Sequence, residues 1–156
     1  MRYFLLALFL LAPLAPAAEN FQTYHNPRFD YAIEYPANLL IPQGEADNGD
    51  GQVFVSPDQQ ARFKIYGTHN VLEESIKDLF HKESQDVATG KITKKVTYKR
   101  QKNNWFVISG YIGNKIFYQK TLLSNDQFKT FYMEYPETQR HLYDHILGRM
   151  ASSFKG

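Results

Sequence analysis

Few residues in this sequence have the types and spacing of a catalytic or metal-binding site. The pattern that comes nearest to a metal site is a histidine pair close to the C-terminus. His141 and His145 stand one helical turn apart with Asp144 between them, which resembles an inverted zinc-protease motif with Asp in place of Glu. A zinc protease also needs a third ligand and a general base. No acid lies among the 11 residues after His145. We therefore expect surface histidines.

A second metal-like segment is the loop Asp47-Asn48-Gly49-Asp50-Gly51. An EF-hand calcium loop requires oxygen ligands at its first, third and fifth positions and Glu at its twelfth. If Asn48 takes the third position of such a loop and Asp50 the fifth, Ala46 takes the first and Pro57 the twelfth. Neither Ala46 nor Pro57 has a side-chain oxygen, so two of the required ligands are missing. Tight turns explain the same composition, because Gly tolerates positive φ and Asn and Asp bond to nearby backbone. We expect turns; weak cation binding and partner contact by Asn48 and Asp50 are the alternatives.

Catalytic motifs are absent from the sequence. It has no Cys nucleophile, no Gly-x-Ser-x-Gly elbow and no glycine-rich phosphate loop. Asp30 and Glu34 are expected to share one strand face, on the solvent side. We predict no enzyme, no cofactor and no metal. The alternatives are an envelope hydrolase that uses loop carboxylates, and a carrier of a small ligand or a metal.

Charge is divided unevenly along the chain. Residues 88–125 hold eight Lys or Arg and no acid, whereas residues 19–86 hold 12 acids and five bases. Strand alternation places Lys95, Thr97 and Lys99 on one side. These cations either protect sheet edges from aggregation or form a docking surface for an anionic partner. The docking hypothesis names Lys95, Lys99 and Arg100, together with Lys115 or Lys120 across the turn. Its aromatic anchors are Trp105, Tyr111 or Tyr118.

The N-terminus has the pattern of a secretory signal peptide. Met1-Arg2 is a short positive start, Phe4–Leu14 is an apolar run of 11 residues, and Ala15-Pro16-Ala17 is a small-x-small cleavage site. The run is shorter than the roughly 20 residues that span a bilayer. We expect a signal peptide at 1–17, one domain at 18–156, and a mature protein in the periplasm or secreted. The net charge of +2 and this compartment argue against nucleic acid as a partner.

The elements that position these residues are mostly strands. Two strands are expected before Pro36, the second at 30–35, followed by a short helical turn at 37–41 and a polar loop at 43–51. Further strands are predicted at 52–56, 61–67, 92–98, 105–112, 116–123 and 128–135. Asn70 and Glu73 resemble a capping box before a helix through Lys82, and a second amphipathic helix runs from Leu142 to Phe154. Short turns make consecutive strands antiparallel.

Three groups of residues resemble a known family. They are Tyr24-x-Asn26-Pro27-Arg28-Phe29-x-Tyr31-x-Ile33-x-Tyr35-Pro36, Asn48-Gly49-Asp50-Gly51 before Val53-Phe54, and Ser153-Phe154. This pattern resembles bacterial exported proteins of the PsbP-like superfamily, which includes the P subunit of the photosystem II oxygen-evolving complex, Mog-type Ran-binding proteins and the periplasmic DcrB-like group. The opening motif is its most specific part.

The resemblance implies a fold and a class of function. The fold is α+β, with a central antiparallel sheet of about six or seven strands between helices, an α/β/α sandwich. The implied function is a non-catalytic binding or accessory domain that docks on another protein or an anionic envelope component. We expect no transmembrane segment in the mature chain.

Overall fold

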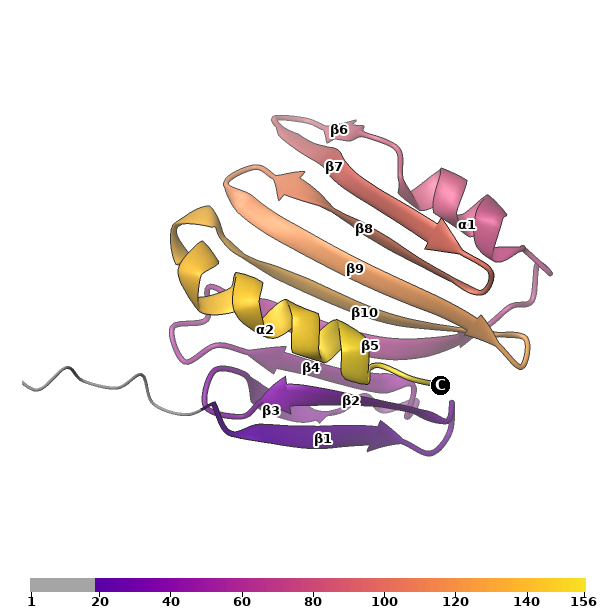
Figure 1. Ribbon diagram of the computed structural model, residues 1–156, viewed down its shortest axis with the longest axis horizontal. Helices are drawn as coiled ribbons and strands as arrows, with labels where there is room; N and C mark the ends of the chain where they lie inside the picture. The colour runs from indigo at the N-terminus through magenta and orange to yellow at the C-terminus, as the bar shows by residue number, and fades with distance from the viewer. Residues whose placement is uncertain (1–18) are drawn as a thin grey trace, which may run out of the picture.

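The computed structural model describes residues 19–156, so the predicted signal peptide at 1–17 lies outside the described residues. Two strands, β1 (Phe21–Asn26) and β2 (Tyr31–Pro36), form a separate antiparallel hairpin. Eight more strands form one antiparallel sheet in the order β3-β4-β5-β10-β9-β8-β7-β6 (Figure 1). These strands are β3 (Ile41–Glu45), β4 (Gly51–Val55), β5 (Arg62–His69), β6 (Val87–Thr89), β7 (Ile92–Lys102), β8 (Trp105–Ile112), β9 (Lys115–Ser124) and β10 (Gln127–Pro136).

The centre of the sheet is a meander of long strands. One of its two-residue turns is Gly113-Asn114, where Gly113 has a φ of 59° that suits such a hairpin loop. Ile112 pairs with Lys115 across this turn. Apolar side chains point to both sides of β8, β9 and β10, so each face of the sheet needs its own cover.

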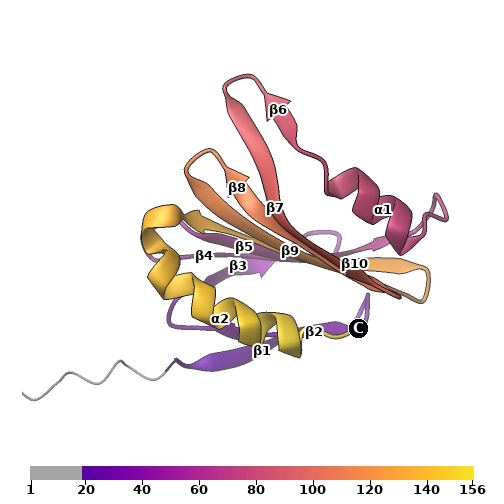
Figure 2. The same cartoon turned by 45° about the horizontal axis from the view of Figure 1, so that its top comes forward.

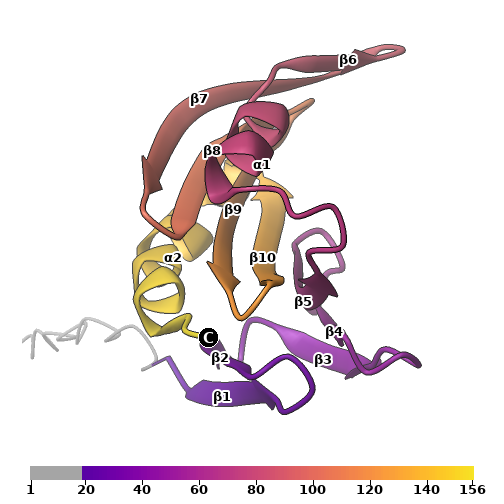
Figure 3. The same ribbon diagram turned by 90° about the vertical axis from the view of Figure 1, so that its right-hand side faces the viewer.

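The two helices lie on opposite faces of the sheet (Figures 2 and 3). After a 3₁₀ turn, η1 (Glu137–Gln139), α2 (Arg140–Ser153) packs against β2 and β10. It buries Tyr143, Ile146, Leu147 and Met150 at helical spacing. The core on this side includes Phe54, Phe63, Phe131 and Phe154 and is the larger of the two.

α1 (Ile76–Glu83) packs against β8 on the other face. Its core is smaller and gathers Ile76, Phe106, Ile108, Phe117 and Phe128, with Leu79 and Phe80 at its edge. Helix α1 has only eight residues. It therefore leaves part of this face open.

The first hairpin is tied to the last residues of the domain. Ala32 and Lys155 exchange backbone hydrogen bonds of 2.9 and 3.1 Å. The backbone N–H of Glu34 also donates to Ser153 Oγ at 2.9 Å. Helix α2 thus lies beside β2, and both pack on the same face of the large sheet.

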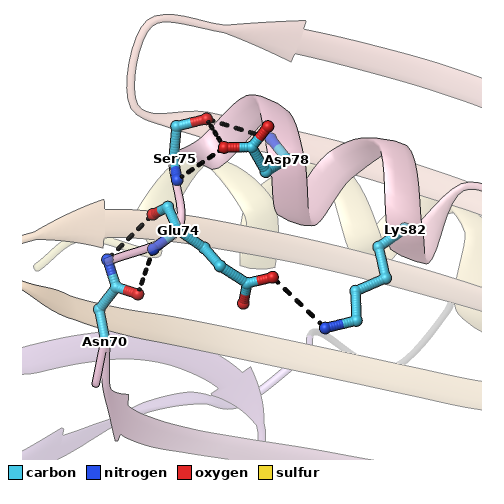
Figure 4. A network of polar contacts seen from close by, with 5 residues as sticks. All are labelled: Asn70, Glu74, Ser75, Asp78 and Lys82. Carbon is cyan, nitrogen blue, oxygen red and sulfur yellow. Dashed lines mark hydrogen bonds and ion pairs between the residues drawn. The ribbon is translucent and has the colours of Figure 1, made fainter. Parts of the chain in front are cut away.

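Each strand predicted after residue 50 is confirmed, but β6 was not predicted. Three further predictions about the fold were wrong. The large sheet has eight strands plus a separate pair, more than the six or seven expected. Residues 41–45, placed in a helical turn and a polar loop, form β3, which is exposed along its length. The third error is the start of α1, where the capping box is Ser75 with Asp78 and not Asn70 with Glu73 (Figure 4).

Candidate functional site

A β-bulge in β7 decides which basic side chains share a face. The pairing of β7 with β8 shifts between Val96 and Tyr98. Lys95 therefore stands opposite Tyr111, on the α2 side, whereas Lys99 stands opposite Ile108, on the α1 side. The prediction that Lys95 and Lys99 share a face was wrong, because the extra residue of a bulge reverses the alternation beyond it.

The bulge gathers a different set of side chains on the α2 side. Tyr98, Arg100 and Lys102 of β7 pair with Ser109, Val107 and Trp105 of β8, and so face the same way as Lys95. Tyr118 and Lys120 of β9 continue this surface. We call this set the basic face: Lys95, Tyr98, Arg100, Lys102, Trp105, Tyr118 and Lys120. It unites Lys95 and Arg100 from the predicted site and excludes Lys99.

A hollow of about 450 Å³ lies at the centre of the basic face, beside the last turn of α2. Arg100 and Lys120 stand on either side of Trp105, each with its charge 5.9 Å from the ring centroid. At these distances both cations are attracted to the face of the indole. The ring and the two cations therefore form one unit that offers positive charge beside a flat apolar surface.

Lys120 is the most constrained cation of this unit. Its Nζ donates to the carbonyl of Ala151 at 2.6 Å, near the C-terminal end of α2. Burial lowers the pKa of Lys120 from its usual value. Neither Lys120 nor Arg100 forms an ion pair with any residue of the described chain, and no carboxylate lines the hollow. An anion bound there would supply the missing countercharge.

The surface continues along α2 into a second hollow of about 330 Å³, which shares Tyr118 with the first. Arg140 lies there, 3.4 Å from Asp144 and with its Nη2 donating to the Tyr111 hydroxyl at 3.0 Å. The two hollows together follow one side of the helix. Their shape suits an extended segment better than a compact ligand.

The other candidate residues lie elsewhere. Asn48 and Asp50 occupy the turn between β3 and β4, and four strands separate β4 from β7. Asn48 Nδ2 donates to Asp50 Oδ2 at 2.8 Å, and the carbonyl of Asp50 accepts from the Tyr31 hydroxyl at 2.8 Å. Gly49 has a φ of 64°. These are the bonds of a tight turn, and they do not join Asn48 and Asp50 to the basic face.

The histidine pair and the paired carboxylates are also separate. His141 and His145 are exposed on α2, and His145 contacts Glu19. Asp30 lies in the turn before β2 with a φ of 49°, whereas Glu34 binds Arg149 at 2.6 Å. The expectation of one shared strand face was wrong because Asp30 precedes the strand. Residues 19–156 contain no group of three or more acidic or histidine side chains placed to hold a metal.

Sequence reasoning missed Tyr98 and Lys102 as parts of one surface, and named Lys120 only as one of two candidates with Lys115. The bulge that turns Tyr98 and Lys102 toward the α2 side leaves no clear mark in the β7 sequence. Lys120 joins through the pairing of β9 with β8, where it stands opposite Val107. Trp105 and Tyr118, which the sequence analysis names as aromatic anchors, both line the hollow.

Comparison with known proteins shows which fold the chain has. No family model matches the chain, and neither does any curated protein. Among solved structures, the chain is similar to cyanobacterial PsbP (CyanoP) from Synechocystis sp. PCC 6803, with 11% identity and a TM-score of 0.56, over 92% of this chain and 99% of that one. No helix within residues 19–156 is both long and apolar enough to cross a membrane. The chain therefore has a PsbP-like fold.

Proposed function

We propose that this protein is an exported, non-catalytic accessory protein that docks on an acidic segment of another protein through the basic face. The observation that carries the proposal is the hollow beside Trp105, where Arg100 and Lys120 have no carboxylate partner among residues 19–156. The partner's carboxylates pair with these two cations. Its aromatic or aliphatic side chains lie on Trp105 and Tyr118.

The energetics of such a contact favour a protein segment. Arg and aromatic residues dominate binding energy at protein interfaces. Arg100 offers paired donors to a carboxylate, while Lys95 and Lys102, both exposed at the rim, attract the partner at long range. An extended acidic chain would follow the hollows along α2.

The fold and the sequence motifs supply independent support. The PsbP-like fold is consistent with an accessory domain, and the opening motif at Tyr24–Pro36 resembles the exported members of that superfamily. The signal-peptide pattern at 1–17 predicts a periplasmic or secreted protein that begins near Ala18. N-terminal sequencing of exported material tests this part, and an intact Met1 there would contradict it.

The docking proposal is tested by site-specific photo-crosslinking in the native envelope. A photoreactive residue at Tyr98 should capture a protein partner, whereas the same residue at Lys99, on the opposite side of the same strand, should not. Mass spectrometry identifies the captured protein and the acidic segment that was joined.

Binding to the purified partner then measures the role of charge. Lys95→Glu, Arg100→Glu and Lys102→Glu together should weaken binding at least about tenfold and reverse its salt dependence, because the new carboxylates repel the acidic segment. Lys77→Glu, Lys91→Glu and Lys99→Glu together are the matched control, since all six side chains are exposed. Equal loss in both triple variants would show a general charge effect and contradict the proposed face.

A further inference from the structure

A cavity of about 300 Å³ lies on the opposite side of the sheet from the basic face. Strands β5, β9 and β10 form its floor, α1 forms one wall, and residues 70–74 form its rim. It exists because α1 is short and packs over β8, which leaves the neighbouring strands uncovered. Its volume is at the lower end of the range for small-molecule sites.

The floor is polar although it borders the apolar core under α1. Gln119, Thr121 and Thr130 are 8%, 0% and 4% exposed, beside the buried rings of Phe117 and Phe128. Gln119 Nε2 donates to Thr121 Oγ1 at 3.2 Å, and the two threonine hydroxyls share a bond of 2.9 Å. Polar groups buried in a sheet face cost free energy unless they are bonded.

One acceptor of this floor has no partner. Gln119 Oε1 forms no hydrogen bond with any of the described residues. This oxygen is not fully enclosed by protein. Within residues 19–156, the one fully enclosed side-chain oxygen or nitrogen without a partner is a different atom, Gln139 Oε1. Because Gln119 is otherwise buried and lines the cavity, its free oxygen faces the cavity.

The charged groups around the cavity are mainly acidic. Glu74 and Glu83 line it, and no Lys or Arg does. Glu74 is bound by Lys82 from the solvent side at 3.4 Å (Figure 4). Glu83 forms no ion pair within residues 19–156, and Lys94 donates to its backbone carbonyl at 2.7 Å. Burial and the charge of Glu83 both raise the pKa of Tyr66 across the cavity.

The rim holds two apolar side chains in solvent. Val71 and Leu72 are 81% and 71% exposed. Asn70 fixes the loop behind them, because its side chain both accepts from and donates to the backbone of Glu74 at 2.9 Å (Figure 4). Glu73 within this loop has a φ of 51°, a strained value for a side-chain-bearing residue. The loop is thus held in place with apolar groups at the mouth of a polar cavity.

We propose that this cavity binds a small organic ammonium ion, a protonated primary amine on a short carbon frame. The ammonium donates to Gln119 Oε1 and to the carboxylate of Glu83, so that its charge is neutralised and two of its three N–H groups have partners. The carbon frame packs on Leu79, Phe128 and Leu72. An anion is disfavoured, because the charged side chains that line the cavity are Glu74 and Glu83.

Two kinds of molecule carry this chemistry, aliphatic amines and amino sugars, and the test separates them. Cadaverine and glucosamine are titrated into the ¹⁵N-labelled domain, with 1,5-pentanediol and glucose as neutral counterparts of similar shape. Amide shifts of Gln119, Thr130 and Leu79 report binding in the cavity. We expect at least one amine to bind below about 10 mM, and neither neutral compound to bind. Which amine binds identifies the class.

The variants locate the interaction. Glu83→Gln keeps the shape of the side chain and should lower the affinity for the amine at least about tenfold. Gln119→Leu should lower it by a similar factor. Glu137→Gln, an exposed acid beyond the cavity, is the matched control and should bind normally. Thermal melts show whether each variant is folded. If Gln119→Leu is unfolded, the affinity of Glu83→Gln for the amine is the result that tests the proposal.

Three outcomes overturn the proposal. They are no binding of either amine by about 10 mM, equal binding of the neutral compounds, and full binding by folded Glu83→Gln. Because the cavity and the basic face lie on opposite sides of the sheet, none of these results bears on docking at Arg100.

Discussion

The two faces of the eight-stranded sheet differ both in how fully they are covered and in the charge that they leave open. On one face, α2 and the β1–β2 hairpin complete a large aromatic core, and the strands beyond it present Arg100 and Lys120. On the other, the eight-residue α1 leaves a cavity bordered by Glu74 and Glu83. One sheet therefore carries an extended cationic surface on one face and a small acidic cavity on the other. The short helix α1 leaves the cavity open, and the bulge in β7 turns Arg100 toward the α2 side.

The sharpest way to test the difference in coverage is to remove one buried side chain from each core. Phe131 is fully buried and its ring lies 5.3 to 6.1 Å from those of Phe154, Tyr118 and Phe63. Phe131→Ala should lower the free energy of unfolding by about 4 kcal/mol. Ile76→Ala, in the α1 core, should cost about 2 kcal/mol. Urea denaturation measures both, and the reverse order would show that the α1 side carries more of the stability than its size suggests.

The bulge is tested at Gly110, which stands opposite it. A Cβ there would lie 1.9 Å from the backbone carbonyl oxygen of Lys95, so β7 must shift to accept any side chain. Gly110→Ala should cost about 2 to 3 kcal/mol and weaken docking by displacing Arg100. Gly148→Ala is the control, because its Cβ meets nothing within 4 Å and it lies inside α2; a stability gain of about 0.5 to 1 kcal/mol is expected. Equal effects in the two variants would argue against a constrained bulge.

A smaller effect is expected from the cap of α1. Ser75 Oγ accepts from the backbone N–H of Asp78 at 3.2 Å, and Asp78 Oδ2 accepts from the backbone N–H of Ser75 at 3.1 Å. Ser75→Ala should lower stability by about 1 kcal/mol and speed hydrogen exchange in α1. Exchange in α2 should stay unchanged. Faster exchange in both helices would mean that the two faces do not open independently.

The smallest effect near neutral pH belongs to Tyr118 on the basic face. Burial raises its pKa from 10.0 to about 12. The folded state thus holds this proton more tightly than the unfolded state, so its contribution is complete below pH 10 and is lost as pH rises through 12. Tyr118→Phe should flatten the alkaline fall in stability over this range. An unchanged slope would place the alkaline sensitivity in other tyrosines.

Local patterns were sufficient for the central strands and for α2. Alternation and the Gly113-Asn114 turn predicted β8 and β9, and four-residue spacing predicted the last helix, because each signal lies within one element. The strand β3 carries no such pattern, since all five of its residues are exposed. The start of α1 was misplaced because Asn70 closes a loop with the same polar chemistry that a helix cap uses.

The candidate surface was predicted less well than the fold. Lys95 and Arg100 were identified from charge alone, but Lys99 was assigned to the wrong side. The position of a bulge depends on the partner strand, here on Gly110 across from Val96, and a single strand does not reveal it. Gln119 and Glu83 gave no signal, because only the tertiary fold brings β9 and the end of α1 around one cavity.

The tie between the β1–β2 hairpin and the far end of the domain has a consequence for the folding pathway. The bond from Glu34 to Ser153 closes a loop of 119 residues, and closing so long a loop carries a large entropic cost early in folding. The β8–β10 meander needs only neighbouring residues, so we expect it to form first and the hairpin to dock last. During synthesis the hairpin emerges well before α2, and until then Ile33 and Tyr35, which are buried in the folded domain, have no core to enter. We therefore expect the β1–β2 hairpin to stay undocked until α2 has been synthesised.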